Sequence, residues 1–468
     1  MKRIFDIFNF VIKIAFLFSF FALLFVLIKM NVLPFKYFLI FIIVSLIVFI
    51  INIIADIFFH NNIFKIFSII LSFVLILGYL FLFNYLNKTN DFFKSLFSNE
   101  QIETYYVAVL KDSNYNNIQD LEDKRIGTFY NNEDSYNEII NNINSLIKHE
   151  EINYNSLLEL SNSLISGEVD AILISDHNKE LLEENEEVNI SLKYIYSFKT
   201  TTKINIESRE FNITKDPFII YVSGIDAYGD ISTVARSDVN IIITVNPTTK
   251  KILLVTIPRD YYVQLHGTTG TKDILTHAGF YGIDMSVTTL EDLLGIDIDY
   301  YVRLNFTTLI KVIDVIGGID IYSDFTFNTY GYQFYQGYNT VNGEYALAFS
   351  RARKNFDGGD KQRGKNQLQV IEALIKKITT SSVLLNNYLS ILESLEGSFQ
   401  TNIESNDIYA LVKMQLSDMS EWSIEKYSLD GFNGNGYTYS LGDILAFIME
   451  PDYSTVNEAK QKIKKIMQ

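Results

Sequence analysis

The sequence predicts an α/β protein built from three parts: a helical membrane anchor, a small α/β domain and a larger strand-rich α/β domain. Three observations predict this order. Three long apolar runs open the chain of 468 residues. Strand and helix signals then alternate over residues 101–200, and beyond residue 213 several strands end in charged side chains. At roughly 100 to 200 residues per domain, the length suits two or three folded units.

The three apolar runs are expected to cross a membrane as helices. They cover residues 10–28, 37–55 and 66–87, within a predicted anchor of residues 1–88. Roughly 20 helical residues cover about 30 Å of hydrocarbon, so each run is long enough to span it. A cleavable signal peptide would be a single, shorter apolar stretch. Lysines flank both ends of the spans, so the charge pattern leaves the orientation open.

Composition excludes several classes of function. The formal net charge of −16 argues against general nucleic-acid binding, because a phosphate backbone would be repelled. The absence of cysteine excludes disulfides, thiolate zinc sites and thiol nucleophiles. The chain also has neither a phosphate-binding Gly-Lys-Ser/Thr loop nor a dinucleotide fingerprint, so a nucleotide is not the expected donor.

Residues 101–200 are predicted to form a small α/β accessory domain. Strands are expected at residues 105–110, 125–129 and 171–174, and a helix at residues 135–147. The segments NIQDLEDKRIGTFY and LISGEVDAILIS resemble parts of periplasmic solute-binding lobes. Two roles stay open for this domain: binding a ligand, or packing and docking a partner.

A first charged cluster is expected at one edge of a sheet. Three strands are predicted, over residues 218–223, 239–245 and 252–257. The turn NPTTKK joins the second strand to the third, so these two should pair antiparallel. The start of the second strand then brings Asp238 close to Arg259, which follows the third strand. If the first strand also pairs antiparallel, its end adds Asp226 to the same edge.

Two aspartates and an arginine in this arrangement indicate a metal-assisted phosphate site. Oxygen ligands suit Mg²⁺ or Mn²⁺, and such ions usually bind together with phosphates. The planar guanidinium group of arginine matches two phosphate oxygens at once. On these residues alone, a purely structural ion pair at a sheet edge is an open alternative.

Further basic residues favour the phosphate site. The segment YALAFSRAR is expected to be a strand that ends in Arg351 and Arg353, with both side chains on one face. A helix should follow and carry Arg363 and Gln367 four residues apart on one side, ahead of an apolar stripe over residues 368–378. A solvated charged surface would not need this placement.

Lys272, in the segment TKDILTHAGFYG, is one more candidate cation, whereas His277 is expected to be structural. Several basic groups and a divalent ion suit an oxyanion-rich substrate such as a pyrophosphate. They would neutralise its charge, position it for in-line attack and stabilise the charge that develops on the leaving phosphate.

Five ordered segments resemble the successive blocks of the LytR-CpsA-Psr family, over roughly residues 216–380. They are GIDAYGDISTVARSDVNIIITVNPTTKKILLVTIPRD, TKDILTHAGFYG, YVRLNFTTLIKVIDVIGGIDIY, VNGEYALAFSRAR and GGDKQRGKNQ. The resemblance implies a central mixed sheet flanked by helices, with a hydrophobic cleft for a polyprenyl chain. It also implies magnesium-dependent transfer of a glycopolymer such as teichoic acid or capsule. The donor would be undecaprenyl pyrophosphate-linked glycan, and the acceptor a hydroxyl group of peptidoglycan.

The resemblance assigns roles residue by residue. The metal-binding aspartates of the family fall on Asp226 and Asp238. Its pyrophosphate-binding residues fall on Arg236, Arg259, Lys272, Arg351, Arg353, Arg363 and Gln367. Arg259, Arg351 and Arg353 are expected to act in catalysis, together with Asp360 as a group that could deprotonate the acceptor. Two positions depart from the family pattern, where Ala227 and Asn366 replace residues that would add phosphate contacts.

The layout is similar to that of capsule-type members of the family. We expect a catalytic domain over residues 213–380 and a helical and β extension over residues 381–468 that packs on it. This layout implies a multi-pass protein of the cell membrane of a Gram-positive-type bacterium, with its C-terminal domains outside the cytoplasm. The oligomeric state and the identity of the glycopolymer stay open.

Two other functions compete with transfer. A pyrophosphatase would use the same site with water as the acceptor. A non-catalytic glycopolymer-binding or regulatory protein would not need both aspartates and the whole set of arginines. A transporter is disfavoured, because the three spans contain neither an intramembrane acid nor paired repeats.

Overall fold

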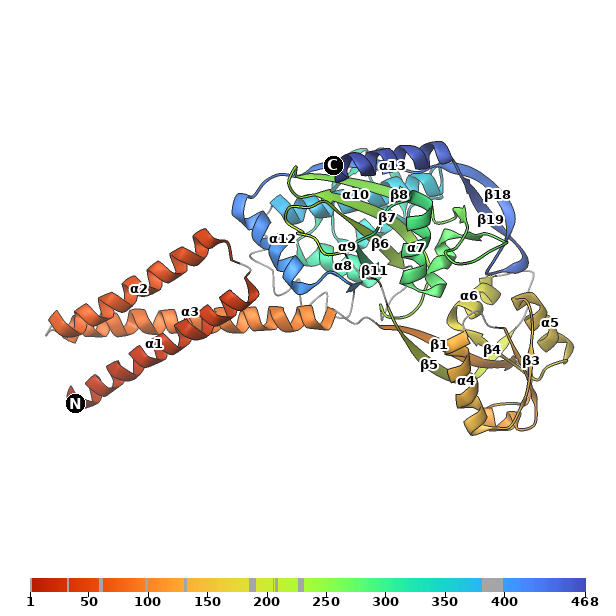
Figure 1. Ribbon diagram of the computed structural model, residues 1–468, viewed down its shortest axis with the longest axis horizontal. Helices are drawn as coiled ribbons and strands as arrows, with labels where there is room; N and C mark the ends of the chain where they lie inside the picture. The colour runs from red at the N-terminus through yellow and green to blue at the C-terminus, as the bar shows by residue number, and fades with distance from the viewer. Residues whose placement is uncertain are drawn as a thin grey trace.

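The three predicted parts are arranged end to end, with the larger domain between the membrane helices and the small domain (Figure 1). The computed structural model describes residues 2–31, 33–58, 62–96, 100–129, 133–184, 191–204, 206, 209–225, 231–380 and 399–468.

The anchor consists of three helices, α1 (Lys2–Met30), α2 (Phe35–Phe58) and α3 (Asn62–Leu96). Each contains a stretch long and apolar enough to cross a membrane: residues 7–30, 35–54 and 64–88. Aromatic rings pack between them, with the Phe20 and Phe41 ring centroids 5.5 Å apart and those of Phe16 and Tyr79 5.7 Å apart. The three predicted apolar helices are therefore confirmed.

The accessory domain has its own five-stranded sheet, in the order β3-β2-β4-β1-β5. The strands are β1 (Glu100–Leu110), β2 (Arg125–Thr128), β3 (Glu150–Asn153), β4 (Ala171–Ser175) and β5 (Leu192–Lys203). The helices are the 3-10 helix η1 (Ile118–Leu121), α4 (Glu133–Leu146), α5 (Leu157–Ser166) and α6 (Asp176–Glu184). Every strand and helix predicted in this part of the sequence is present.

The larger domain is built on a six-stranded mixed sheet, in the order β16-β11-β6-β7-β8-β17. The strands are β6 (Phe218–Ile225), β7 (Ser237–Asn246), β8 (Lys251–Ile257), β11 (Tyr300–Asn305), β16 (Phe399–Thr401) and β17 (Ser423–Ser428). Strand β7 pairs antiparallel with both β6 and β8, as predicted. Strands β11 and β17 run parallel to β6 and β8.

Helices cover both faces of this sheet. One face packs against α7 (Ile283–Leu294) and α13 (Tyr453–Met467), around buried residues such as Ile242 and Val255. The other face packs against α10 (Asp360–Thr380) and α12 (Ser405–Asp418), around Ile241 and Leu254. The alternation of side chains along each strand supplies both apolar faces.

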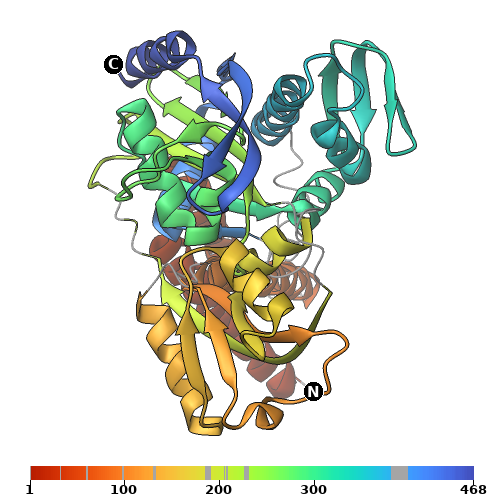
Figure 2. The same cartoon turned by 90° about the vertical axis from the view of Figure 1, so that its right-hand side faces the viewer.

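A lobe of helices and short strands extends beside α10 (Figure 2). It comprises α8 (Phe306–Val315), β12 (Ile319–Ser323), β13 (Phe327–Thr329), β14 (Tyr332–Phe334), β15 (Gly337–Val341) and α9 (Gly343–Arg351). On the side facing the accessory domain lie β9 (Tyr262–Val263), β10 (Asp273–Ile274), the 3-10 helix η2 (Leu275–Tyr281), β18 (Gly431–Thr438) and β19 (Gly442–Pro451).

Two expectations from the sequence need correction. The segment expected to be a strand is helix α9, which ends at Arg351, and Arg353 lies just beyond it. Asn342 caps this helix by accepting a hydrogen bond from the Tyr345 backbone, and the alanines and leucine that follow favour a helix. The boundary at residue 380 is also misplaced, because β16 and β17 lie beyond it and form the two edges of the central sheet.

Candidate functional site

The site is centred on Asp238 at the start of β7 and Arg259 just after β8. Arg259 Nη1 donates a hydrogen bond of 2.8 Å to Asp238 Oδ1, as the antiparallel pairing predicted. Thr276 Oγ1 donates to the same carboxylate oxygen over 3.0 Å. Gly279 lets η2 approach this closely, because a Cβ atom there would lie 2.5 Å from the Ala235 carbonyl oxygen. The carboxylate is therefore buried among fixed donors.

Helix α10 contributes a second arginine to this centre. Arg363 Nη2 donates to the backbone carbonyl oxygen of Asp238 over 3.0 Å. Its Nη1 atom lies 3.4 Å from Asp360 Oδ1, in the first turn of the same helix. Asp238, Arg259, Asp360 and Arg363 thus form one charged cluster, which we call the central cluster.

Opposite charges control ionisation in the central cluster. Burial alone would raise the pKa of Asp238, but Arg259 and Arg363 outweigh that effect and lower it. Burial would lower the pKa of Arg259, but Asp238 and Asp260 outweigh it and raise this pKa. Both groups are therefore held in their charged forms. The buried Nε atom of Arg259 makes no hydrogen bond among the described residues, and Asp260 Oδ1 lies 3.4 Å from it.

An apolar cavity of about 60 Å³ opens on one side of the central cluster. It lies between the central sheet and helices α8, α9 and α10. Its wall is aliphatic, and its polar groups come from Asp238, Asn305, Ser350, Arg351, Arg363 and Gln367. The cavity provides the hydrophobic cleft that the sequence predicted, with charge gathered on its lining.

A polar cleft of about 840 Å³ opens on the other side of the central cluster. Its charged lining residues are Arg236, Arg259, Asp260, Arg353, Asp357, Asp360 and Lys361. Leu181 of α6 and Leu445 of β19 also line it. The central cluster therefore separates an apolar cavity from an open, charged cleft.

The structure separates two arginines that the sequence placed on one face. Arg351 lines the apolar cavity, and its guanidinium carbon lies 4.5 Å from the ring centroid of Phe306 and 5.2 Å from that of Tyr330. Arg353 lines the polar cleft. Arg351 is the last residue of α9, whereas Arg353 follows the extended residue Ala352 beyond the end of the helix. The two side chains therefore do not share the face that a continuous strand would give them.

The other predicted residues have mixed outcomes. Arg236 lines the polar cleft and Gln367 the apolar cavity. Lys272 lines neither, and instead its ammonium group lies 3.6 Å from Glu450 Oε2 and 5.3 Å from the ring centroid of Tyr262. Asp226 lies outside the described residues, and so does Ala227.

His277 and Asn366 have structural partners. His277 Nδ1 lies 2.7 Å from the buried carboxylate of Asp273. Asn366, where the family pattern has a phosphate-contacting residue, donates a hydrogen bond of 3.1 Å to the Phe349 carbonyl oxygen. Asn366 therefore joins α10 to α9 and does not contact the site.

Sequence reasoning missed Asp260, which lies in the polar cleft. Burial raises the pKa of Asp260, Asp360 adds to the effect, and Arg259 only partly opposes it. A carboxyl group of raised pKa suits proton transfer near neutral pH. In the sequence, Asp260 could have been identified from its position directly after Arg259.

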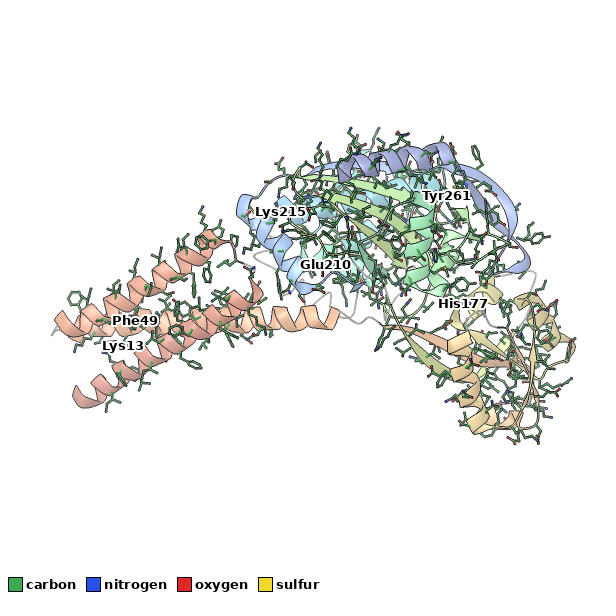
Figure 3. All side chains as sticks on the ribbon, in the orientation of Figure 1. Lys13, Phe49, His177, Glu210, Lys215 and Tyr261 are labelled. Atoms are coloured by element: carbon green, nitrogen blue, oxygen red, sulfur yellow. The ribbon has the colours of Figure 1, made fainter. Side chains whose placement is uncertain are left out.

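The accessory domain reaches the polar cleft through α6. Arg236 Nε lies 3.4 Å from Glu180 Oε2. His177 stacks on Phe280 with ring centroids 5.1 Å apart, and His277 stacks on the same ring at 5.3 Å. Figure 3 shows His177 where the two domains meet. Leu181 also contributes to a hydrophobic core that both domains share.

The described residues supply only part of a metal site. Among them, no group of three or more His, Asp or Glu side chains could hold a metal ion. Asp238 offers one carboxylate, whose Oδ1 atom already accepts hydrogen bonds from Arg259 and Thr276. A cation at this edge of the sheet would therefore need Asp226 as well.

Comparison with known proteins finds the same family that the sequence segments resemble. The model of the LytR_cpsA_psr family matches residues 183–458, more than half of the chain. The model described as NMT1/THI5 like matches residues 94–214, which include the accessory domain. The first match extends beyond residue 380, in agreement with the corrected boundary of the larger domain.

Two similar relatives are each named polyisoprenyl-teichoic acid–peptidoglycan teichoic acid transferase TagU. The protein from Bacillus licheniformis is 35% identical over 243 residues, which cover 50% of this chain and 78% of the relative. The protein from Enterococcus faecalis is 33% identical over 232 residues, which cover 49% and 76%. Among solved structures, B. subtilis TagV is 31% identical with a TM-score of 0.46, covering 54% of this chain and 98% of TagV.

Proposed function

Because the chain belongs to the LytR-CpsA-Psr family, we propose that it transfers a phosphate-linked glycopolymer from polyprenyl pyrophosphate to a hydroxyl group of peptidoglycan. The observation that carries this proposal is the position of the central cluster, between the apolar cavity and the polar cleft. A polyprenyl pyrophosphate glycan has the same order of parts: an apolar chain, two phosphates and a polar polymer. The TagU relatives are named for the same type of reaction.

The charged residues have distinct parts in this reaction. Arg351 and Arg363 approach the pyrophosphate from the apolar cavity, and Arg236, Arg259 and Arg353 from the polar cleft. The acceptor oxygen attacks the phosphorus that carries the glycan, and the bond from that phosphorus to the bridging oxygen breaks. Polyprenyl phosphate leaves, and its new negative charge is stabilised by the guanidinium groups.

Either of two carboxylates can take the proton of the acceptor hydroxyl. Asp360 lines the polar cleft, where the acceptor would enter, and its position matches the residue expected from the sequence. Asp260 lines the same cleft and has the raised pKa that a general base needs. We assign the role to Asp360, with Asp260 as the alternative.

The proposed cofactor is Mg²⁺, or Mn²⁺, held by Asp226 and Asp238. When bound, the ion would neutralise part of the pyrophosphate charge and orient its oxygens. The support is the carboxylate of Asp238, which the neighbouring arginines keep ionised despite its burial. Arg259 fixes the orientation of that carboxylate, and its side chain also lines the polar cleft that the substrate would occupy.

The proposed location is the cell membrane, with α1, α2 and α3 crossing the bilayer and both folded domains outside the cytoplasm. The support is the apolar length of the three helices. The reaction also requires this location, because peptidoglycan lies outside the membrane.

Mass spectrometry of bound lipid tests the proposal. The full chain is purified in detergent from a bacterium that makes polyprenyl carriers, and the extracted lipids are analysed. We expect polyprenyl phosphate or pyrophosphate, reduced in Arg259→Ala and unchanged in the control Arg125→Ala, a partly exposed arginine of the accessory domain. A protein that carries no such lipid and fails to bind added polyprenyl pyrophosphate would contradict the proposal.

A further inference from the structure

A second and larger apolar cavity, of about 810 Å³, lies between the membrane helices and the larger domain. On the membrane side it is lined by Leu27 of α1 and by Leu82 and Leu86 of α3. On the other side it is lined by residues of β6, β7, α10 and α12. We call it the membrane-side cavity.

The membrane-side cavity and the apolar cavity of the site lie in line along the same elements. On β6, Phe218 and Ile220 line the membrane-side cavity, and Val222 and Gly224 line the other. Residues two apart in a strand share one face, so Phe218, Ile220 and Val222 form a continuous row of side chains that ends at Gly224. The two cavities therefore follow one face of the central sheet.

Helix α10 shows the same order. Ile378 and Ile375 line the membrane-side cavity, whereas Ile371, Gln367 and Arg363 line the apolar cavity of the site. From Ile378 to Arg363 the helix rises about 22 Å at 1.5 Å per residue. The apolar stripe of α10 thus runs from the membrane helices to the central cluster.

Residues typical of a membrane surface surround the membrane-side cavity. Trp422 and Tyr85 line it, and these residue types concentrate where hydrocarbon meets water. Lys250 lies 5.0 Å from the ring centroid of Trp422. Lys413 of α12 donates a hydrogen bond of 2.7 Å to Asn31 Oδ1, at the end of α1. These residues indicate that the membrane-side cavity lies at the level of the bilayer surface.

We propose that α1 and α3 form the entrance through which the polyprenyl chain passes from the bilayer into the site. The membrane helices are then part of the substrate-binding site as well as an anchor. The occupant is a long isoprenoid chain with a phosphate head, because both cavities are lined mainly by apolar side chains and the one at the site also by Asp238 and Arg363. Such a chain would cross into the site without exposing apolar surface to water, which is the main cost of leaving the bilayer.

This inference rests on the proposed function, and site-specific photo-cross-linking separates the two. The full chain is placed in nanodiscs that contain labelled polyprenyl pyrophosphate. The photoreactive amino acid p-benzoylphenylalanine replaces Leu82 in the membrane-side cavity, Leu309 in the apolar cavity of the site, or Leu77 as a control. Leu82 and Leu77 belong to the same helix and are 44% and 53% exposed, but only Leu82 lines the cavity.

We expect labelled carrier at Leu82 and Leu309. Arg363→Ala should reduce both yields about tenfold, because the variant loses a charged hydrogen bond to the phosphate. The yield at Leu77 should be lower and should not respond to Arg363→Ala. Label at Leu309 but not at Leu82 would overturn the entrance and leave the proposed function intact.

Two other outcomes would also count against the inference. Equal labelling at Leu82 and Leu77, unaffected by Arg363→Ala, would show that bulk bilayer lipid fills the membrane-side cavity. Absence of label at both Leu82 and Leu309 would contradict carrier binding itself, and with it the proposed function.

Discussion

Arg363 Nη2 donates a hydrogen bond to the backbone carbonyl oxygen of Asp238, over 3.0 Å. The first turn of α10 is thereby fixed to the start of β7, although the two residues are far apart in the sequence. This contact aligns the apolar stripe of α10 with the sheet. One hydrogen bond therefore connects the charged end of the site to the wall of its apolar cavity.

The first prediction concerns the charge of Asp238. Asp238→Asn keeps the size of the side chain but removes the carboxylate that pairs most closely with buried Arg259, so that only Asp260 is left beside it. Removing one member of a buried ion pair typically costs about 3 kcal/mol, so we expect a lower free energy of unfolding and loss of transfer activity. Denaturant unfolding and a transfer assay measure both. Asp292→Asn, which removes an exposed carboxylate paired with His266, is the matched control and should change neither.

The second prediction concerns the shape of the arginine side chains. Arg351→Lys and Arg353→Lys keep the charge but remove the planar group that binds two phosphate oxygens, so both should impair transfer. The loss should be larger for Arg351, about tenfold or more, because it also loses stacking on Phe306 and Tyr330. Steady-state kinetics at varied donor concentration would show it. Normal turnover in both variants would show that charge attraction alone binds the phosphates and that the planar shape of the guanidinium group is not needed.

The third prediction uses the raised pKa of Asp260. A carboxyl group whose pKa is higher in the folded state than its usual value of about 3.9 destabilises the fold when ionised. Asp260→Asn should therefore increase the free energy of unfolding at pH 7, by on the order of 1 kcal/mol. The gain should shrink as the pH falls through the folded pKa and vanish below about 4. A gain that persisted at low pH would contradict a titrating carboxyl as its source.

The fourth prediction concerns the contact between domains. Glu180 lies 3.4 Å from Arg236 and competes with a phosphate for the same guanidinium group. Glu180→Gln should change KM for the donor while leaving the free energy of unfolding nearly unchanged, because the pair is partly exposed and contributes little. Glu168→Gln, an exposed position of the same domain, is the control. Identical KM values for both variants would exclude a positioning role for Glu180.

Local pattern was enough to predict the centre of the site. The short turn between β7 and β8 left only an antiparallel pairing, and this pairing determines that Asp238 and Arg259 meet. The apolar stripe of α10 was likewise visible as a 3.6-residue period. Both are local features, in which neighbours in sequence determine which side chains share a face.

Other features depended on contacts that no local pattern encodes. The segment before Arg351 alternates large and small residues and so resembles a strand, but its cap and alanines make it a helix. Strands β16 and β17 join the sheet edges from the C-terminal region. Buried Arg303 donates to the carbonyl oxygens of Ile231 and Thr233, a distant pairing that orders the segment ahead of Arg236.

Transfer in a purified system tests the central claim most directly. The full chain in nanodiscs is supplied with a polyprenyl pyrophosphate-linked glycopolymer, Mg²⁺ and soluble peptidoglycan strands, and the products are identified by mass spectrometry. We predict polymer joined to peptidoglycan through a phosphodiester bond, together with an equal amount of polyprenyl phosphate. Release of polyprenyl phosphate with free polymer and unmodified peptidoglycan would contradict the account and identify a pyrophosphatase instead.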